Sequence, residues 1–237
     1  MNKPLPKVAI LEDDPDCRTL LRYMLGFEHD VYFAQCGADL LKRVDCGSVD
    51  VVLLDIQLPR EDGFSIARAI RRASRVPIVF VSALDADDAV VKGLNIGGDD
   101  YVTKPFSQAV LTARIRNLLR REPDSTQPPS AHVRVGGFRL DLDRSVLIDG
   151  KGGALPLTEM EARVLALLMQ NGGVPVTRDD LYRSIHGRDW DRMSREIDVH
   201  VSNLRRKLEL TFGLVDALRH VRGTGYRLCL TAFGAEI

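Results

Sequence analysis

The chain has 237 residues, of which 45% are hydrophobic, and its 33 basic residues balance its 33 acidic residues. This length predicts one large or two ordinary globular domains, and we favour two. The balanced charge by itself indicates no nucleic-acid partner. The apolar stretch "VPIVFVSAL" is too short for a membrane span, which needs roughly 18 residues, and the early acids exclude a secretory signal. We therefore expect a cytoplasmic protein with no membrane partner.

The first half of the chain alternates apolar runs with amphipathic segments. The apolar runs cover residues 8–11, 30–34, 51–54, 77–83 and 100–103, and the amphipathic segments cover residues 16–25, 37–44, 63–72, 88–94 and 107–121. Five strands that are each followed by a helix predict a five-stranded, doubly wound parallel sheet of the α/β class. We place this flavodoxin-like domain at residues 1–121.

Chemically active residues end four of these predicted strands. They are Glu12 and Asp13 after the first strand, Asp55 after the third, Ser82 at the end of the fourth and Lys104 after the fifth. Since the carboxyl ends of parallel strands share one edge of the sheet, these side chains should lie together. Any one of the acids taken alone reads more simply as a helix cap or a solvated loop residue, but four strands with the same feature argue against that interpretation.

The residue types at this edge indicate phosphoryl chemistry. Three carboxylates form an oxygen-rich site suited to Mg²⁺. A carboxylate beside such an ion can attack phosphorus and form an aspartyl phosphate, while the metal and Lys104 neutralise the charge of the transferring group. Ser82 can donate a hydrogen bond to a phosphoryl oxygen.

Residues 122–130, "EPDSTQPPS", are rich in proline and contain no apolar residue, which predicts a linker over 122–131. Beyond it, residues 133–157 predict a small antiparallel sheet. Thr158 with Glu161 has the spacing of a capping box for a helix that ends at Asn171. Thr177 and Ser194 can cap two further helices, to about Ile185 and about Glu209, and residues 217–230 predict a hairpin. We place this α+β domain at residues 132–237.

The motifs of the first domain resemble the receiver domain of two-component response regulators. The matching stretches are "ILEDD" (10–14), "LLDIQLPREDGF" (53–64), "VSA" (81–83) and "GGDDYVTKPF" (97–106). The resemblance implies that Asp55 accepts the phosphate. It implies further that Asp13, Asp55 and the Gln57 backbone carbonyl bind Mg²⁺, with Glu12 acting indirectly. It also implies that Ser82 and Lys104 contact the phosphoryl group, that Tyr101 is the aromatic switch, and that the Lys104–Pro105 peptide is cis.

Two positions near Asp55 bear on how long the phosphate lasts. The Gln57 side chain can orient a hydrolytic water, whereas the apolar Leu84 can shield the phosphate from water. These effects oppose each other, so the sequence leaves the lifetime open.

Receivers of the OmpR/PhoB subfamily pair through three salt bridges between subunits. The positions that this resemblance assigns here are Val90 with Val110, Asp99 with Arg114, and Asp100 with Arg121. One ion pair has thus become apolar on both sides. Exposed ion pairs contribute only about 0–1 kcal/mol, and a buried valine roughly 1.5–3 kcal/mol. A homodimer with the valine pair therefore need not be weaker than one with the ion pair. Its formation also need not depend on phosphorylation. The valines can equally pack inside their own protomer.

The second domain resembles the winged helix-turn-helix effector of the same subfamily, chiefly in "IDVHVSNLRRKL" and "HVRGTGYRL". The expected third helix carries an apolar stripe at Ile197, Val201, Leu204 and Leu208. Its other residues would face double-stranded DNA in the major groove, while Arg222 reaches the minor groove. The predicted DNA-binding residues are Arg195, Glu196, His200, Ser202, Asn203, Arg205, Lys207 and Arg222. Such a polar face is by itself more often only a solvated surface.

Three residues of this domain need separate interpretations. Asn203 predicts a preference for adenine, because asparagine pairs bidentately with that base. Glu196 either accepts from a cytosine amino group or caps the helix. Trp190 lies in the segment 186–193, which matches a loop that can touch RNA polymerase, although we favour a core position for this tryptophan.

The four cysteines, Cys17, Cys36, Cys46 and Cys229, form no C-x-x-C pair, which argues against a zinc site or disulfides and for reduced thiols. The sequence thus predicts a phosphorylation-controlled, DNA-binding response regulator that receives its phosphate from a sensor histidine kinase and binds tandem half-sites. We do not expect an enzyme beyond its own phosphotransfer and autodephosphorylation. A phosphatase of the haloacid-dehalogenase type is the enzyme rival, but it needs an acid where Gln57 stands. A constitutive, phosphorylation-independent dimer is the other alternative.

Overall fold

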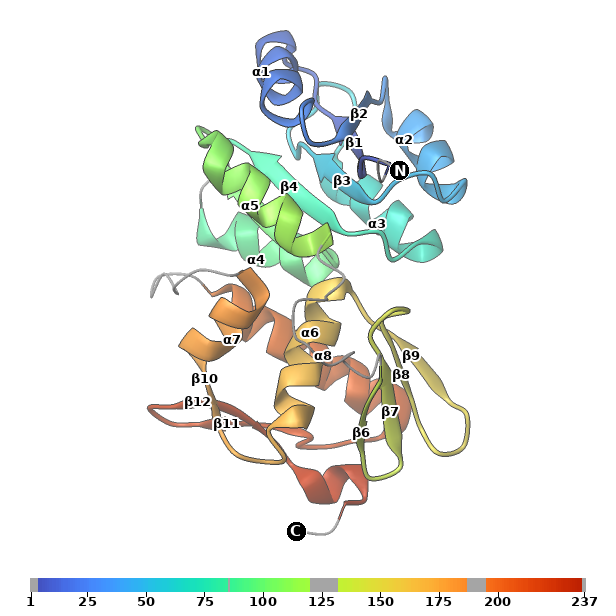
Figure 1. Cartoon of the computed structure of the whole chain (residues 1–237), viewed down its shortest axis with the longest axis vertical. Coiled ribbons are helices and arrows are strands. Elements are labelled where there is room, and N and C mark those ends of the chain that lie inside the picture. Colours follow the sequence, from blue (N-terminus) through green and yellow to red (C-terminus); the bar gives the residue numbers. More distant parts are fainter. Residues whose placement is uncertain (1–3, 85, 120–131, 187–194, 236–237) are drawn as a thin grey trace. The chain divides into compact units, whose positions relative to one another are not determined.

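The computed structural model describes residues 4–84, 86–119, 132–186 and 195–235 (Figure 1). The chain forms two compact units, residues 1–120 and 121–237. The predicted linker, Arg121, Trp190 and the predicted cap Ser194 lie outside the described residues. Within the described part of the chain, no helix is both long enough and apolar enough to cross a membrane.

The first unit is a parallel sheet with helices on both faces, as predicted. Its strand order is β2-β1-β3-β4-β5. The strands are β1 (Lys7–Leu11), β2 (Asp30–Phe33), β3 (Val51–Leu54), β4 (Ile78–Ser82) and β5 (Asp100–Thr103). All four residues of β3 are buried, because helices cover the sheet on both sides.

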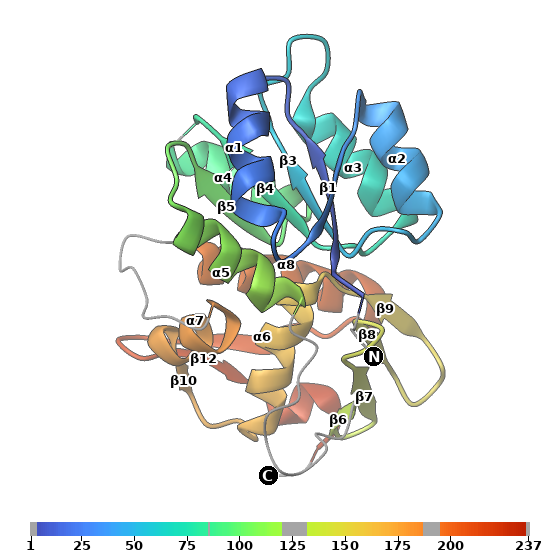
Figure 2. The same cartoon turned by 45° about the horizontal axis from the view of Figure 1, so that its top comes forward.

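Five helices make these two covering layers. They are α1 (Pro15–Leu25), α2 (Gly37–Asp45), α3 (Gly63–Ala73), α4 (Asp87–Ile96) and α5 (Gln108–Leu119). Helices α1 and α5 contact each other on one face, while α3 contacts both α2 and α4 on the other (Figure 2). Strand order reverses beside β1, so the carboxyl ends of β1 and β3 frame the crevice where this class of fold binds its ligands.

Local capping places the turns that follow β1 and β3. The Asp14 side chain accepts from the backbone N–H of Asp16 at 2.9 Å, and Pro15 starts the helix, where a missing N–H costs nothing. Asp62 caps α3 in the same way. Gly63 must be glycine, because a Cβ there would lie 2.1 Å from the backbone oxygen of Asp55. The loop after β3 can therefore fold back tightly over Asp55.

A buried ion pair lies at the amino-terminal ends of β4 and β5. Arg71 Nη2, on α3, lies 2.7 Å from Asp99 Oδ2, and that same oxygen accepts from the Ile78 N–H at 2.9 Å. Two further Arg71 nitrogens donate to the backbone oxygens of Gly97 and Val76. Because the guanidinium satisfies several acceptors at once, the charge is tolerated in the interior.

The second unit begins with an antiparallel sheet of order β6-β7-β8-β9. Its strands are β6 (His132–Val135), β7 (Phe138–Asp141), β8 (Val146–Ile148) and β9 (Ala154–Pro156). Helix α6 (Glu159–Gln170) follows, and the predicted capping box of Thr158 and Glu161 is present. Helix α7 (Arg178–His186) starts after Thr177, whose hydroxyl accepts from the Asp180 N–H as predicted.

Helix α8 (Glu196–Phe212) runs three residues beyond its predicted end at Glu209 and stops at Gly213, which has a φ of 69°. Its N-cap is Arg195, without a side-chain cap. The predicted hairpin is present as β11 (Leu218–Val221) and β12 (Gly225–Leu228), but β12 also pairs with β10 (Val176–Thr177), which the sequence did not indicate. A single 3-10 turn at Leu230–Phe233 ends the described fold.

We predict that Arg71→Leu destabilises the first unit by roughly 3–5 kcal/mol, because it leaves the Asp99 carboxylate buried without its cation. Hydrogen exchange of the β4 and β5 amides in the full chain reports this unit alone. Arg72→Leu, an exposed neighbour on α3, is the matched control. Equal protection of β4 and β5 in both variants would show that the ion pair contributes nothing to stability.

Candidate functional site

Three carboxylates meet at the carboxyl edge of the parallel sheet. Glu12 and Asp13 follow β1, and Asp55 follows β3. One oxygen from each lies within 4.8 Å of the others. Glu12 and Asp55 are only 2% and 5% exposed, whereas Asp13 is open to solvent. Carboxylates this close repel one another, and an oxygen-only donor set with one open side fits a hard cation such as Mg²⁺.

Lys104 joins two of these carboxylates. Its Nζ donates to Glu12 Oε2 and to Asp55 Oδ2, each at 2.7 Å. Burial would lower the Lys104 pKa, but the hydrogen bonds to Asp55 and Glu12 outweigh burial and hold that pKa above its usual value. The lysine is therefore a fixed cation that neutralises part of the site. The peptide to Pro105 is cis, as the resemblance implies.

The remaining predicted residues of this site follow β3, end β4 or lie in β5. The Gln57 N–H donates to Asp55 Oδ1 at 2.9 Å, so both carboxylate oxygens of Asp55 are held. Ser82 ends β4 and is fully buried, and its hydroxyl accepts from the Leu84 N–H at 3.3 Å. The Tyr101 hydroxyl donates to the Leu84 carbonyl at 2.7 Å. Ser82 and Tyr101 are thus linked through the backbone of one loop residue.

Sequence reasoning missed two contributors to this site. The Cys17 thiol donates to Glu12, and burial together with this bond raises the pKa of Cys17 to about 12. Glu61 accepts from the Gly37 N–H at 2.8 Å and so ties the loop after β3 to the start of α2, which has no cap from its own N-cap side chain. Glu61 stands directly beside Asp62, the cap residue of α3, but no spacing rule in the sequence pairs it with a glycine in another loop.

Charged residues assigned to the dimer surface also have partners within the chain. Arg114 donates to Asp100, and Asp99 pairs with Arg71. Consecutive residues at the start of a strand point to opposite faces of the sheet, so one aspartate faces α3 and the other α5. Val90 packs against the core, and Val110 on α5 is 40% exposed. These positions remain predictions for a contact between subunits.

The predicted DNA-binding residues lie on α8 and at the hairpin tip. The apolar stripe of α8 is buried as expected. Arg195, Ser202 and Arg222 are exposed, whereas His200 and Asn203 are buried, at 1% and 4% exposure. Their contacts with DNA remain predictions.

Three other predicted DNA-binding residues have partners inside the second unit. Arg205 Nε donates to the Leu218 carbonyl at 2.7 Å, and Lys207 Nζ donates to Glu161 Oε2 at 2.5 Å. Glu196 Oε2 lies 3.0 Å from His186 Nε2. These contacts show that part of the polar face of α8 braces the fold, and any role in DNA binding would be additional.

Sequence reasoning also missed a polar cluster around Tyr226 of β12. Its hydroxyl donates to Asp198 of α8, and both groups also bond to Arg178 at the start of α7. The three residues are up to 48 positions apart in the chain, so no local pattern joins them.

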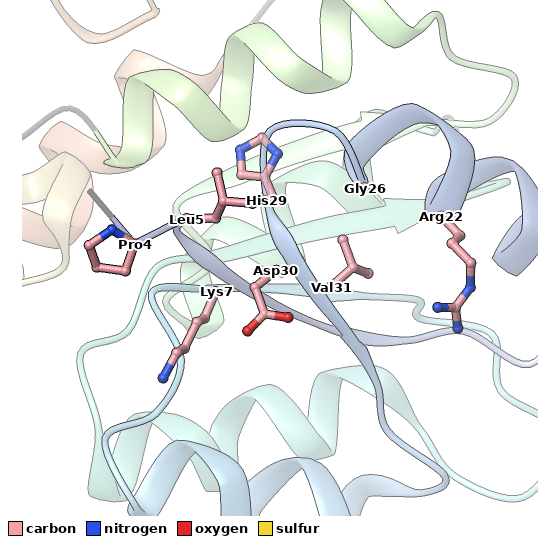
Figure 3. A pocket seen from close by; sticks show the side chains of 8 residues that line it. All are labelled: Pro4, Leu5, Lys7, Arg22, Gly26, His29, Asp30 and Val31. Carbon is pink, nitrogen blue, oxygen red and sulfur yellow. The ribbon is translucent and has the colours of Figure 1, made fainter. Parts of the chain in front are cut away.

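An open hollow of about 610 Å³ lies at the other edge of the first sheet (Figure 3). Its lining residues come from the N-terminal segment, from the end of α1 and from the start of β1 and β2: Pro4, Leu5, Lys7, Arg22, Gly26, His29, Asp30 and Val31. It contains none of the predicted site residues.

Comparison with known protein families matches two parts of the chain. Residues 8–116 match the "Response regulator receiver domain" and residues 152–228 match "Transcriptional regulatory protein, C terminal". The sensory transduction protein RegX3 of Mycobacterium tuberculosis is 38% identical over 94% of this chain and 99% of its own length. The transcriptional regulatory protein AfsQ1 of Streptomyces coelicolor is 39% identical over 94% of this chain and 98% of its own.

Solved structures agree with these matches. The response regulator DrrB of Thermotoga maritima, described as an OmpR/PhoB homolog, is 28% identical, with a TM-score of 0.50 over 94% of this chain and 99% of that chain. A RitR mutant has a TM-score of 0.73 at 21% identity over 94% of this chain and 99% of that chain, and it supports the fold alone. The acid cluster, the parallel receiver sheet and the helix with its hairpin thus belong to a known pair of domains. The chain is a member of the OmpR/PhoB-type two-component response regulators, which are non-enzymatic transcription regulators with a receiver domain and a winged helix-turn-helix DNA-binding domain.

Proposed function

We propose that Asp55 accepts a phosphoryl group from a sensor histidine kinase and that this modification promotes receiver dimerisation and DNA binding. The observation that carries the proposal is the position of Lys104, whose single ammonium group bonds to both Asp55 and Glu12. A cation at that place neutralises charge on a group transferred to Asp55. Asp55 itself is buried on a rigid strand end, which favours a fixed line of attack.

Different residues of the chain would form the new bond, hold the metal and neutralise charge during phosphotransfer. An Asp55 oxygen forms the new bond to phosphorus while the bond from phosphorus to the donor nitrogen breaks. Asp13, Asp55 and the Gln57 carbonyl would hold Mg²⁺, with Glu12 acting indirectly, and the ion would neutralise the phosphoryl oxygens. Lys104 moves from the carboxylate to the phosphoryl group, since both are anionic and lie on the same strand end.

Signal transmission would follow from the shared contact with Leu84. A phosphoryl oxygen on Asp55 would offer the Ser82 hydroxyl proton a charged acceptor. Movement of Ser82 toward it would lengthen the bond that its oxygen now accepts from the Leu84 N–H. The loop that carries Leu84 also accepts from Tyr101, so a shift of Ser82 changes the position of the tyrosine. Phosphorylation would thus shift an existing equilibrium toward the receiver form that dimerises.

On DNA, two winged domains would occupy tandem half-sites about one helical turn apart. Arg195, His200, Ser202 and Arg205 would hold phosphates, and Lys207 would add positive charge. Arg222 at the exposed hairpin tip would enter the minor groove. Asn203 would read adenine, and Glu196 would either accept from cytosine or serve only the helix start. RNA polymerase would contact the segment 186–193, most of which lies outside the described residues.

An alternative keeps the DNA-binding output but makes the dimer independent of phosphate. Val110 is exposed on α5, and an apolar contact there loses no strength in salt. Asp99 is paired with Arg71 inside the chain, and in this alternative it would add no charge pair to the interface. In this alternative, Val90 and Val110 would hold the receivers together, with Asp100, Arg114 and Arg121 in supporting positions.

We expect acetyl phosphate with Mg²⁺ to add one phosphoryl group to the protein, detectable by mass spectrometry, and Asp55→Asn to abolish the addition. Asp50→Asn is the matched control, because Asp50 precedes the opposite end of β3 and only accepts from the Lys7 N–H. Sedimentation of the same samples separates the two candidate functions. A phosphate-dependent dimer supports the main proposal, and an unchanged dimer in every sample supports the alternative. Phosphorylation of Asp55→Asn to the wild-type level would contradict the assignment of Asp55 as the phosphoacceptor.

We expect DNA selected by the full-length protein from a random pool to show adenine at one position of each half-site because of Asn203. Asn203→Arg should change that preference to guanine, with about 1–3 kcal/mol of discrimination. Ser202→Ala, on the adjacent position of α8, should lower affinity without changing any base preference, because phosphate contacts carry no sequence information. Two outcomes would refute the role of Asn203 in reading adenine. One is that the selected sites have no position with adenine, and the other is that the Asn203→Arg protein selects the same base as the wild type.

A further inference from the structure

The hairpin formed by β11 and β12, which we call the wing, is attached to the rest of its unit on two sides. The first attachment is made by the backbone. Strand β12 pairs with β10 through Val176 with Tyr226 and Thr177 with Gly225. A Cβ at Gly225 would lie 2.1 Å from the Val176 oxygen, so the two strands approach as closely as a glycine allows. This pairing fixes the wing against β10 but not against α8.

The second attachment is made by side chains and has Asp198 of α8 at its centre. The Tyr226 hydroxyl donates to Asp198 Oδ1, and Arg178 Nε donates to the same oxygen at 3.0 Å. Arg178 Nη2 also donates to the Tyr226 hydroxyl at 3.3 Å. These three residues belong to β12, α8 and α7, so one closed set of hydrogen bonds joins the wing to both helices.

Arg205 makes a further contact between α8 and the wing. It lies seven residues after Asp198, on the same face of α8 two turns later. Its Nε donates to the Leu218 carbonyl of β11, and its guanidinium lies 5.6 Å from the centre of the Tyr226 ring. The Arg178 guanidinium lies 4.9 Å from that ring centre. Two contacts at different points along a helix fix the angle of the wing as well as its distance.

The central hydrogen bond keeps its donor proton at the near-neutral pH of binding assays. Burial, followed by the hydrogen bond to Asp198, raises the pKa of Tyr226 to about 12. The phenol therefore keeps its proton and stays a donor to the carboxylate. Tyr226 itself is only 5% exposed, whereas the Asp198 side chain is 42% exposed.

We propose that Arg178, Asp198 and Tyr226 form a positioning device that sets the distance and angle between α8 and the wing tip, so that both engage DNA at once. The proposal rests on the DNA contacts given above for α8 and Arg222. Two binding elements held in the correct relative position bind without the entropic cost of ordering the second one. Tyr226 and Asp198 act through this geometry and are positioning residues.

The test uses the full-length protein with Tyr226→Phe, which removes one hydroxyl and keeps the ring. The probe is the duplex that the wild-type protein enriches from a random pool, and affinity is measured over a range of salt concentrations. We expect affinity to fall about tenfold, and the slope of log affinity against log salt to become shallower by about 0.9, the value for one lost phosphate contact. Base preference should weaken at the flanking positions read by the wing and persist at the positions read by α8.

Tyr32→Phe is the matched control, because the Tyr32 hydroxyl also donates to an aspartate, Asp39 Oδ2 at 2.7 Å, but in the receiver unit. It should leave affinity, salt slope and base preference unchanged. Asp198→Asn keeps an acceptor for Tyr226 and should give a smaller loss than Tyr226→Phe. Arg222→Ala identifies the positions that the wing reads.

Two results would overturn the positioning role. One is a Tyr226→Phe protein with wild-type affinity, slope and preference although Arg222→Ala alters the flanking positions. The other is an equal loss of preference at every position together with a lower melting temperature, which is the result of a merely structural residue. If Arg222→Ala itself alters no position, the proposed minor-groove contact fails, and this positioning role, which rests on that contact, is overturned with it.

Discussion

The contact on which the proposed receiver chemistry depends is the one from Lys104 to both Asp55 and Glu12. It places a permanent positive charge between two nearly buried carboxylates that would otherwise repel each other. Because Lys104 follows β5, while Asp55 and Glu12 follow β3 and β1, the contact also joins three strand ends across the crevice. Lys104 therefore offsets one of the three negative charges of the site, and the remaining carboxylate charge suits a cation.

Much of this arrangement was predictable from residue order alone. The uninterrupted apolar run of β3 indicated a strand covered on both faces, and the topology of parallel sheets then brings every carboxyl end to one edge. That rule sufficed to assemble Glu12, Asp13, Asp55, Ser82 and Lys104. The capping box at Thr158 and the apolar stripe of α8 were predictable for the same reason, since both are spacings within one helix.

Contacts between distant elements were not predictable in this way. Asp99 and Asp100 are neighbours with the same side chain, but the alternation of a strand sends one to Arg71 and the other to Arg114. Tyr226 and Asp198 lie 28 residues apart, and only the packing of β12 on α8 brings them together. Helix α8 extended to Phe212 because its end is set by the left-handed conformation of Gly213, while the apolar stripe used for the prediction stops at Leu208.

The central claim is that Lys104 exchanges its carboxylate partner for the phosphoryl group. Mg²⁺ affinity and DNA affinity of full-length Lys104→Met, each measured with and without acetyl phosphate, test it most directly. Removal of the competing cation should tighten Mg²⁺ binding, because the carboxylates lose their only described lysine partner. The phosphate-induced gain in DNA affinity should disappear. A variant that binds Mg²⁺ no more tightly and still gains DNA affinity on phosphorylation would contradict the account.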